Sequence, residues 1–432
     1  RPRAGRGGHL AALGRGAGGG LAPGPRRARR RRRGWRVPAL PQPPPPSIAI
    51  DARKLADFGI GTYLRGLLGS LARLDTESRY LLLAPRAARE LLPDLPGNFT
   101  WIDESAPGYS WREQWSIGQH LSRLRPDLFH SPHYVLPLRT PARVVVTIHD
   151  LIHLLFPGFL PHPLALPYAR LLLRRAVRRA DRVLTVSAAT AADLEQHLGV
   201  ARRRIDVIWN GVDDAFRHRI EAPELARELA AVGLSPGYFL FLGNPKPHKN
   251  LERVVRAFAR LPHDGRRLVI AGASAAADSA RLRQWARELA LGERLVVLGH
   301  LAPASLPALV QGALALIFPS LYEGFGLPLA EAMAAGTPVV ASTTPALVEI
   351  AGGAAELVDP LDVGAIAGGM ARLAADPQRR QELVQAGRTR AEAFRWETAA
   401  AQTLAVYRRV IDAGDASDAS GAPAARRRER PA

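Results

Sequence analysis

Two acids bracket a glycine-containing loop late in the chain, and their spacing suggests anion chemistry. Glu323 precedes the loop glycines, and Glu331 follows eight positions later. The apolar run Leu314–Phe318 predicts a buried strand, Leu329–Ala335 a helix and Thr337–Ala341 the next strand. Such a unit directs the free N–H groups of a helix N-terminus at a bound anion, and flanking carboxylates can accept hydrogen bonds from sugar hydroxyls. The pattern suggests a nucleotide-sugar site; for each acid alone, a helix-dipole or solvated-loop role is the alternative.

Lysine usage points to a second part of the same site. Only three of the 59 basic residues are lysines, and two of them, Lys246 and Lys249, fall in the loop Gly243–Asn250. This loop follows the apolar run Tyr238–Leu242, which predicts another strand. An ammonium group on a flexible stem is a good point charge for phosphate, and arginine does not replace it freely. We therefore expect the loop to bind a diphosphate, with a solvated loop as the alternative.

The elements that must position these residues alternate between apolar strands and amphipathic helices. The alternation predicts an α/β fold with parallel sheets, whose ligands bind beyond the carboxyl ends of the strands. The polar stretch Asp213–Ser235 suggests a linker between two halves, and Gly59–Ala72 a glycine turn leading into a helix. The predicted strands are Ser47–Asp51, Tyr80–Ala84, Asp127–His130, Val144–His149, Arg182–Ser187 and Ile205–Trp209 in the first half, and Tyr238–Leu242, Arg267–Ala271, Leu295–Leu298, Leu314–Phe318, Pro338–Ala341 and Ala355–Val358 in the second.

The chain divides into five predicted parts. They are a disordered Arg/Gly/Pro-rich tail at 1–46, a Rossmann-like domain at 47–225, a second one at 226–395, a last helix at 396–411 and a disordered tail at 412–432. The first tail holds 12 arginines and no acid, so it carries more than half of the net charge of +20. It could be a basic arm for RNA or anionic lipid, a transit-type peptide, or translated sequence upstream of the true start. The absence of a first Met and the Ala, Arg and Pro bias favour the last interpretation.

Composition narrows the class of protein further. The chain has no cysteine, so we expect neither a disulfide framework nor a cysteine-ligated metal. It has no run of about 18 apolar residues that could span a bilayer, so we expect a cytoplasmic protein. The segment Pro163–Arg182 fits a basic amphipathic helix. It could contact anionic lipid or a lipid-diphosphate acceptor at the inner membrane face, or it could be an ordinary exposed helix in an arginine-rich protein.

These segments resemble the donor-binding signature of the retaining glycosyltransferases of family GT4. The match runs without a gap over Glu323, Gly324, Phe325, Gly326 and Glu331. The wider resemblance covers residues 47 to 411 and includes Asn210-Gly-Val-Asp213 and Trp396. It implies the GT-B fold, with two Rossmann-like domains facing each other across a cleft and a C-terminal helix crossing back to the N-terminal domain. The N-terminal domain would take the acceptor, and the C-terminal domain the donor.

The resemblance also implies a role for individual residues. Lys249 would neutralise the donor diphosphate, Glu331 would bind the ribose hydroxyls, and Glu323 the hydroxyls of the transferred sugar. His149 would contact that sugar near C6. The family commonly has an arginine directly after the first glycine of the lysine loop, so here a neighbour, Lys246 or His248, would supply the second positive charge. The other donor-binding positions implied are Gly61, Asn244, Lys246, Gly324, Phe325, Gly326 and Leu327.

Several histidines follow predicted strands and should lie near the cleft. His149 and His153 have helical i, i+4 spacing, which allows a zinc alternative. However, Asp150 stands where that motif expects a general-base Glu, and no third ligand is evident. His130 and His133 are predicted at the same cleft edge, with a surface-loop role as the alternative. We therefore predict no metal site.

The implied reaction is transfer of a hexosyl group from a nucleotide diphosphate sugar to an acceptor hydroxyl, with retention and without a cofactor. The Gly243–Asn250 segment is similar to that of bacterial GT4 mannosyltransferases of polysaccharide biosynthesis, which favours GDP-mannose and a glycan or lipid-linked acceptor. UDP-glucose and other UDP-sugars stay open. A glycan phosphorylase would need a lysine for pyridoxal phosphate, and neither Lys54, Lys246 nor Lys249 has that context. Nucleic-acid binding is suggested only by the Arg-rich ends, which lack interleaved aromatics.

Overall fold

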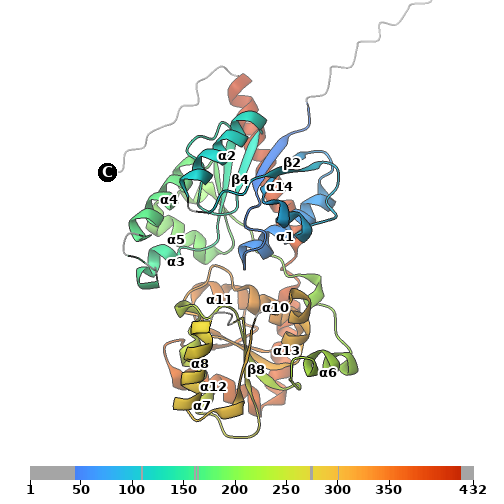
Figure 1. The fold of residues 1–432 in the computed structure, drawn as a ribbon, viewed down its shortest axis with the longest axis vertical. Coiled ribbons are helices and arrows are strands. Elements are labelled where there is room, and N and C mark those ends of the chain that lie inside the picture. The colour runs from blue at the N-terminus through green and yellow to red at the C-terminus, as the bar shows by residue number, and fades with distance from the viewer. Residues whose placement is uncertain are drawn as a thin grey trace, which may run out of the picture. The chain divides into compact units, whose positions relative to one another are not determined.

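Two parallel sheets organise the protein (Figure 1). The computed structural model describes residues 44–108, 110–159, 162, 165–272, 276–299 and 301–419. The first sheet has seven strands in the order β3-β2-β1-β4-β5-β6-β7, and the second has six in the order β10-β9-β8-β11-β12-β13. All of their pairings are parallel, so the predicted α/β architecture is confirmed. The strands are β1 Ser47–Asp51, β2 Arg79–Ala84, β3 Phe99–Asp103, β4 Leu128–Ser131, β5 Arg143–Ile148, β6 Arg182–Thr185, β7 Ile205–Val207, β8 Tyr238–Leu242, β9 Leu268–Ala271, β10 Leu295–Leu298, β11 Ala313–Phe318, β12 Val339–Ser342 and β13 Glu356–Val358.

The strand order determines where a ligand can bind. In each sheet the order reverses between two central strands, β1 and β4 in the first and β8 and β11 in the second. The loops on either side of such a reversal diverge beyond the carboxyl ends of the strands and leave a crevice. The lysine loop, Gly243–Asn250, follows β8. The loop 319–326 between β11 and α10, which we call the Glu-Gly loop, follows β11. The two motifs singled out by the sequence therefore flank one reversal point, although 74 positions separate Lys249 from Glu323.

Helices cover both faces of each sheet (Figure 1). In the first half, α1 and α14 share one buried apolar cluster with β1 and β2, while α2, α4 and α5 pack on the opposite face. Their apolar residues recur every three or four positions, as on Leu64, Leu67, Leu68 and Leu71 of α1, which gives each helix one buried stripe. The helices are α1 Ile60–Leu74, α2 Trp111–Leu124, α3 Ile152–Leu155, α4 Ala165–Arg179, α5 Ala188–Leu198, α6 Ala222–Ala230, α7 Leu251–Ala259, α8 Ala276–Glu288, α9 Leu306–Gln311, α10 Leu327–Ala335, α11 Pro345–Ala351, α12 Val363–Ala375, α13 Pro377–Ala391 and α14 Trp396–Ala419.

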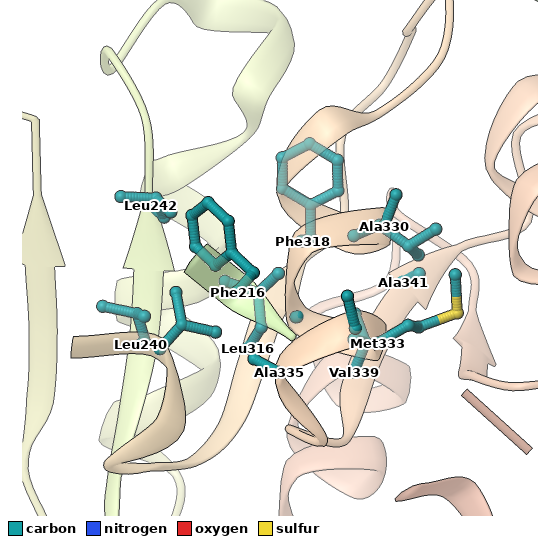
Figure 2. Close-up of a cluster of buried hydrophobic side chains, with 14 of the residues drawn as sticks. Phe216, Leu240, Leu242, Leu316, Phe318, Ala330, Met333, Ala335, Val339 and Ala341 are labelled. Carbon is teal, nitrogen blue, oxygen red and sulfur yellow. The ribbon is translucent and has the colours of Figure 1, made fainter. Parts of the chain in front are cut away.

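Helix α10 is fixed tightly against the second sheet. Figure 2 shows the side chains of β8, β11 and β12 gathered with those of α10 in one apolar cluster. Leu316 and Phe318 of β11 are fully buried there, and Ala330 and Met333 of α10 belong to the same cluster. Small alanine side chains allow the helix to approach the sheet closely, so packing determines where its N-terminus points.

The last helix returns to the first half, as predicted, and it is longer than predicted. Trp396 packs so closely on Gly66 of α1 that a Cβ atom there would lie 2.2 Å from the indole ring. Helix α14 continues to Ala419, so the prediction of disorder from residue 412 is wrong for 412–419. No proline interrupts this stretch, and Gly414 lets the helix lie against the guanidinium group of Arg143. The rest of that predicted tail, 420–432, and residues 1–43 of the first tail lie outside the described residues.

Two other elements differ from the prediction. The edge strand β3, Phe99–Asp103, went unpredicted because it is short and only its first residue is buried. The polar stretch assigned to a linker contains helix α6, Ala222–Ala230, whose sole buried residue is Leu229. Its only large apolar side chains are Leu225 and Leu229, and nine residues with so few give a weak helix signal within a charged stretch. The predicted domain boundaries at 225/226 and 395/396 stay predictions.

Candidate active site

A cavity of about 430 Å³ lies at the carboxyl ends of the central strands, with walls from both halves. Ten of the eleven predicted site residues line it. The exception is Gly61, where a Cβ atom would lie 2.5 Å from the carbonyl oxygen of Leu55, so this glycine serves the packing of α1 instead. The lining includes Phe58, Gly59, Ile60, Thr62, His149, Asp150, Val186 and Asn210 from the first half and Gly243, Asn244, Lys246, His248, Lys249, Leu301, Leu306, Glu323, Gly324, Phe325, Gly326, Leu327 and Glu331 from the second.

The lysine loop and the Glu-Gly loop are joined by an ion pair. The Nζ of Lys249 lies 2.7 Å from Oε1 of Glu323, and both side chains are mostly buried. Lys249 also lies 5.0 Å from the ring centroid of Phe318, which adds a cation–π contact. The backbone N–H of Leu321 donates to the carbonyl of His248 over 2.7 Å, so the two loops are also connected through the main chain. A phosphate group entering the cavity would compete with Glu323 for the ammonium group.

Asn250 holds the end of the lysine loop in place. Its backbone has a φ of 63°, a left-handed conformation that asparagine tolerates better than most residues. Its side-chain amide donates to the carbonyls of Pro319 and Pro360 over 3.0 and 2.6 Å. The first of these carbonyls begins the Glu-Gly loop. The short turn Pro247–Lys249 is thereby held against β11, which directs Lys249 into the cavity.

The glycines of the Glu-Gly loop serve contacts within the protein. A Cβ atom on Gly324 would lie 1.8 Å from the carbonyl oxygen of His149, so only glycine allows the two halves to approach here. Gly326 has a φ of 92° and faces Leu347, where a Cβ atom would be 2.4 Å from Cδ2. Both residues also line the cavity.

The N-terminus of α10 is open to an anion. The helix begins at Leu327 after Gly326, and no side chain caps it. Pro328 has no N–H and the N–H of Leu329 donates to the carbonyl of Gly326 over 3.0 Å, so in the first turn the N–H of Leu327 is the group that can bind a phosphate oxygen. Glu331 lies in the second turn, not in the first as the sequence suggested, because the helix starts before Pro328. The helix dipole alone therefore does not explain this acid.

Glu331 is the acid with the most unusual environment. Burial, together with the nearby carboxylate of Asp213, raises the pKa of its carboxyl group to about 7. Near neutral pH this group is therefore partly protonated before a ligand binds. Sugar hydroxyls that donate to the carboxylate would favour its charged form. An acid poised in this way in a cavity is a candidate for ligand binding.

His149 is held as a neutral hydrogen-bond acceptor. Its Nε2 lies 3.0 Å from the carbonyl oxygen of Pro132, which can only accept, so Nε2 carries the proton. Nδ1 is then the acceptor nitrogen. Burial lowers the pKa of the ring, and the ring of Tyr63 packs edge-on against it at 4.8 Å. His149 can therefore accept a hydrogen bond from a sugar hydroxyl but is a poor proton donor.

The other predicted histidines lie outside the cavity lining. His130 is fully buried and bonds Tyr407 and Thr147 over 2.6 and 2.8 Å. Burial lowers its pKa to about 3. His133 is buried beside Asp51, and desolvation lowers its pKa to about 4. Neither the cleft-edge prediction nor the surface-loop alternative holds for this pair, because both histidines are internal supports.

The zinc alternative finds no support in the structure. The Nδ1 of His153 bonds the hydroxyl of Tyr134 over 2.9 Å, and His153 does not line the cavity with His149. Within the described ranges, no group of three or more His, Cys, Asp or Glu side chains could hold a metal ion.

Asn210 is a lining residue that the sequence analysis did not assign to the site. Its side chain is 4% exposed, and its Oδ1 has no hydrogen-bond partner among the residues that the structure describes. It follows β7 at the carboxyl edge of the first sheet, and the next residue, Gly211, is packed against Trp396. Its position just beyond a predicted strand was the available signal. Leu301 and Leu306 were also missed, because apolar residues carry no chemical signature.

Hydrogen bonds between the two halves hold the cavity closed on one side. Glu349 of α11 accepts from the backbone N–H groups of Ala188 and Ala189 over 2.9 and 3.0 Å, at the start of α5. The hydroxyl of Tyr322 donates to Asp193 over 2.7 Å and accepts from the N–H of Leu151 over 3.1 Å. Glu349 lies on α11, which packs against the Glu-Gly loop at Gly326. Tyr322 belongs to that loop.

Known proteins match this chain in both halves. Residues 59–216 match the family described as "Glycosyltransferase Family 4", and residues 228–390 match "Glycosyl transferases group 1". The chain is 29% identical over 301 residues to the O-antigen chain mannosyltransferase B of Escherichia coli, covering 69% of this chain and 77% of that protein. It is 30% identical over 318 residues to the D-inositol 3-phosphate glycosyltransferase of Xylanimonas cellulosilytica, covering 71% and 70%. Sucrose-phosphate synthase from Thermosynechococcus elongatus has a similar structure, with a TM-score of 0.70 at 22% identity over 85% of this chain and 100% of that one.

The fold and the cavity define a two-domain α/β transferase of the GT-B type, as the sequence predicted. The chain belongs to the family 4, group 1 glycosyltransferases, and it is a hexosyltransferase. Among the helices that the structure describes, none is both long and apolar enough to cross a membrane.

Proposed function

We propose that this enzyme transfers a hexosyl group, with mannose favoured, from a nucleotide diphosphate sugar to a glycan or lipid-linked acceptor, with retention at the anomeric carbon. The observation that carries the proposal is the shared cavity. It brings Lys249, Glu323, Glu331 and His149 around the uncapped N-terminus of α10. This set of groups suits a diphosphate with a sugar at each end. The cation and the helix N-terminus suit the diphosphate, and the two acids and the neutral acceptor nitrogen suit the hydroxyls of the sugars.

The proposed mechanism begins with an exchange of partners at Lys249. The diphosphate takes the ammonium group from Glu323, and the freed carboxylate then accepts hydrogen bonds from hydroxyls of the transferred sugar. Glu331 binds the ribose hydroxyls, and Nδ1 of His149 accepts from a sugar hydroxyl. Lys249 and the N-terminus of α10 stabilise the negative charge that grows on the diphosphate as the bond from C1 to oxygen breaks.

The remaining step needs no protein nucleophile. The acceptor hydroxyl attacks C1 on the face that the diphosphate leaves, forms the new C1–O bond and passes its proton to the departing phosphate oxygen. This route gives retention, which NMR of the anomeric proton in the first product tests; an inverted product would exclude it. We propose that no metal takes part, and EDTA should then leave turnover unchanged.

The donor preference rests on the mannosyltransferase relative and on the lysine loop. A thermal-shift panel of GDP-mannose, UDP-glucose, UDP-galactose and ADP-glucose separates the alternatives, because at equal concentration the donor that binds most tightly raises the melting temperature most. The largest shift with GDP-mannose, followed by mannosyl transfer, supports the proposal. A larger shift with a UDP-sugar would make the enzyme a UDP-dependent hexosyltransferase. A lipid-linked acceptor would also require peripheral contact with a membrane.

A further inference from the structure

The outer side of α4 carries a stripe of basic residues. Arg170, Arg174 and Arg178 are exposed and lie one helical turn apart. Within the described part of the chain, no ion pair joins any of the three to a carboxylate, and α4 itself contains no acidic residue. The opposite side of the helix, with Leu173 and Val177, is buried against the first sheet.

Large apolar side chains stand exposed around this stripe. Leu171 of α4 is 64% exposed, and Leu138 in the loop before β5 is 61% exposed. Trp111 and Trp115, one turn apart on α2, are 84% and 67% exposed. A single exposed apolar residue is ordinary, but two tryptophans and two leucines beside unpaired arginines indicate a contact surface.

Hydrogen bonds hold α2, α4 and the loop before β5 side by side. Arg175 of α4 donates to the side chain of Gln114 over 3.3 Å and to the carbonyl of Pro137 over 2.6 Å. Gln114 directly precedes Trp115, and Pro137 directly precedes Leu138. A cavity of about 790 Å³ runs between Leu138 and α4. We call this surface the basic–aromatic face, and it consists of Trp111, Trp115, Leu138, Arg170, Leu171, Arg174 and Arg178.

The arginine bias of the whole sequence does not explain the unpaired charges. Helix α13 has four arginines in a similar length. There Arg379 pairs with Glu356 and Glu382, and Arg390 donates to the carbonyls of Glu349 and Ile350. Arg380 also donates to the carbonyl of Leu373, so three of the four arginines in that helix have partners within the protein. On α4 the exposed stripe has none of this kind.

We propose that the basic–aromatic face docks on an anionic lipid bilayer. The three arginines suit lipid phosphates, because a guanidinium group binds phosphate through paired N–H donors. Trp111 and Trp115 suit the boundary between headgroups and acyl chains. There the indole N–H can hydrogen-bond to water or headgroups while the apolar ring is buried among acyl chains. The inference deepens the membrane contact in the proposed function. Binding to vesicles needs no sugar donor, so failure of either idea leaves the other standing.

Vesicle sedimentation of the full chain tests the charged part of the face. The probe is phosphatidylcholine vesicles with and without about 30 mol% phosphatidylglycerol, at low salt. We expect Arg170→Gln/Arg174→Gln/Arg178→Gln to weaken binding to the anionic vesicles at least 10-fold, since each basic residue near the surface contributes a several-fold factor. Pure phosphatidylcholine should bind the wild type far more weakly.

The matched control removes three exposed arginines from the second half, Arg227→Gln/Arg283→Gln/Arg287→Gln. It lowers the net charge equally, so it reports on non-specific attraction, and we expect less than a twofold change. All variants keep the arginine-rich residues 1–46, which could bind anionic lipid by themselves. If both triple variants sediment like the wild type, or lose binding equally, the proposal is wrong.

A brominated lipid tests the aromatic part independently of charge. Bromine in the acyl chain quenches tryptophan fluorescence only at close range. We expect quenching of the wild type on binding anionic vesicles, and most of it should disappear in Trp111→Ser/Trp115→Ser. Unchanged quenching in that variant would assign the signal to another tryptophan, such as Trp35 in the basic tail, and would overturn the assignment. Near-UV circular dichroism without vesicles checks that the variant is folded.

Discussion

The two halves of the cavity are built from different chemistry. The second half contributes charged groups: the Lys249–Glu323 ion pair at 2.7 Å and Glu331, whose pKa burial raises to about 7. Apart from the carboxylate of Asp150, the first half contributes neutral groups. Burial lowers the pKa of His149, and the ring is fixed as an acceptor by the carbonyl of Pro132.

This difference follows the charge that the proposed reaction develops. The departing diphosphate gains negative charge, so the half that binds it needs a cation and N–H dipoles. The transferred sugar and the acceptor hydroxyl are neutral, so the half that positions them needs hydrogen-bond acceptors and apolar walls. Substitutions in the second half should therefore change rates most. Those in the first half should have smaller effects that depend on geometry.

The largest effect is expected for Lys249→Ala. The variant lacks the cation that would stabilise the leaving diphosphate, and we expect kcat to fall about 100- to 1000-fold. The loss of the ion pair with Glu323 should lower the melting temperature only slightly, because the freed carboxylate lines an open cavity and can be hydrated. Turnover with saturating donor is the measurement.

Lys54→Ala is the matched control for that variant. Lys54 also forms an ion pair, with Asp57 over 2.8 Å, but it does not line the cavity. We expect its turnover within twofold of the wild type. If Lys249→Ala also stayed within twofold, the contrast between the halves and the diphosphate assignment would both fail.

A smaller effect on catalysis, together with a gain in stability, is expected for Glu331→Gln. The pKa of this carboxyl is about 7 in the folded protein, against an ordinary value of 4.5 for a glutamate in water. The folded state therefore holds the proton more tightly, and its stability falls as the pH rises from about 4.5 to about 7. Glutamine removes this penalty, on the order of 3 kcal/mol. At pH 8 the variant should melt at a higher temperature than the wild type, and the gap should close toward pH 4.5.

The same variant should bind nucleotide less well. Glutamine is a weaker acceptor than a carboxylate for two ribose hydroxyls, so we expect about a 10-fold loss of affinity at pH 8 by calorimetry. Wild-type affinity should also decline below pH 7 as Glu331 is protonated. Glu382→Gln, at an exposed ion pair with Arg379, is the control and should change neither quantity. Equal nucleotide affinity of wild type and Glu331→Gln would argue against a ribose contact.

The sequence predicted the second half of the cavity well because its motifs are short. Glu323 and Glu331 lie on one loop and the helix after it, and Lys249 lies on a loop directly after a strand. The spacing of these residues along the chain is therefore enough to indicate a site for an anion and a sugar. Parallel strands also bring such loops to the same edge, so the α/β fold was enough to bring the two motifs together.

Contacts between distant segments could not be predicted in this way. Gly324 must be glycine because a carbonyl of the other half, that of His149, lies against it. His130 is internal because Tyr407, 277 positions away, returns on α14 to bond it. Arginines on α4 and α13 look alike in sequence, and only the fold shows which have partners. Each of these properties depends on tertiary packing and not on neighbours in the chain.

In the first half, His149→Phe should lower kcat about 10-fold. Phenylalanine fills a similar volume but cannot accept from a sugar hydroxyl, so it tests the hydrogen bond and not the packing against Tyr63. His153→Phe is the control, because that ring bonds Tyr134 outside the cavity lining. Since burial lowers the pKa of His149, the wild-type rate should show no decline from its protonation between pH 8 and pH 6.5. An equal loss in both variants would indicate a structural effect.

The smallest effect is expected for Tyr407→Phe, which breaks a buried chain of hydrogen bonds leading to the cavity. Tyr407 bonds His130, His130 bonds Thr147, and the hydroxyl of Tyr63 bonds Thr147 over 3.1 Å. Tyr63 in turn packs on His149. If this chain positions His149, the variant should lose about threefold in kcat at unchanged donor KM.

Tyr238→Phe separates positioning from simple loss of stability. Its hydroxyl donates to the carbonyl of Leu309 over 2.6 Å, as buried a bond as that of Tyr407, but in the second half and outside the cavity lining. Each variant should cost about 1 kcal/mol of unfolding free energy. Only Tyr407→Phe should also change kcat, because only its hydroxyl connects to His149. Equal kcat in the two variants would mean that the buried series of hydrogen bonds supports only the fold. His149 would then be the only one of these residues of the first half to affect the reaction.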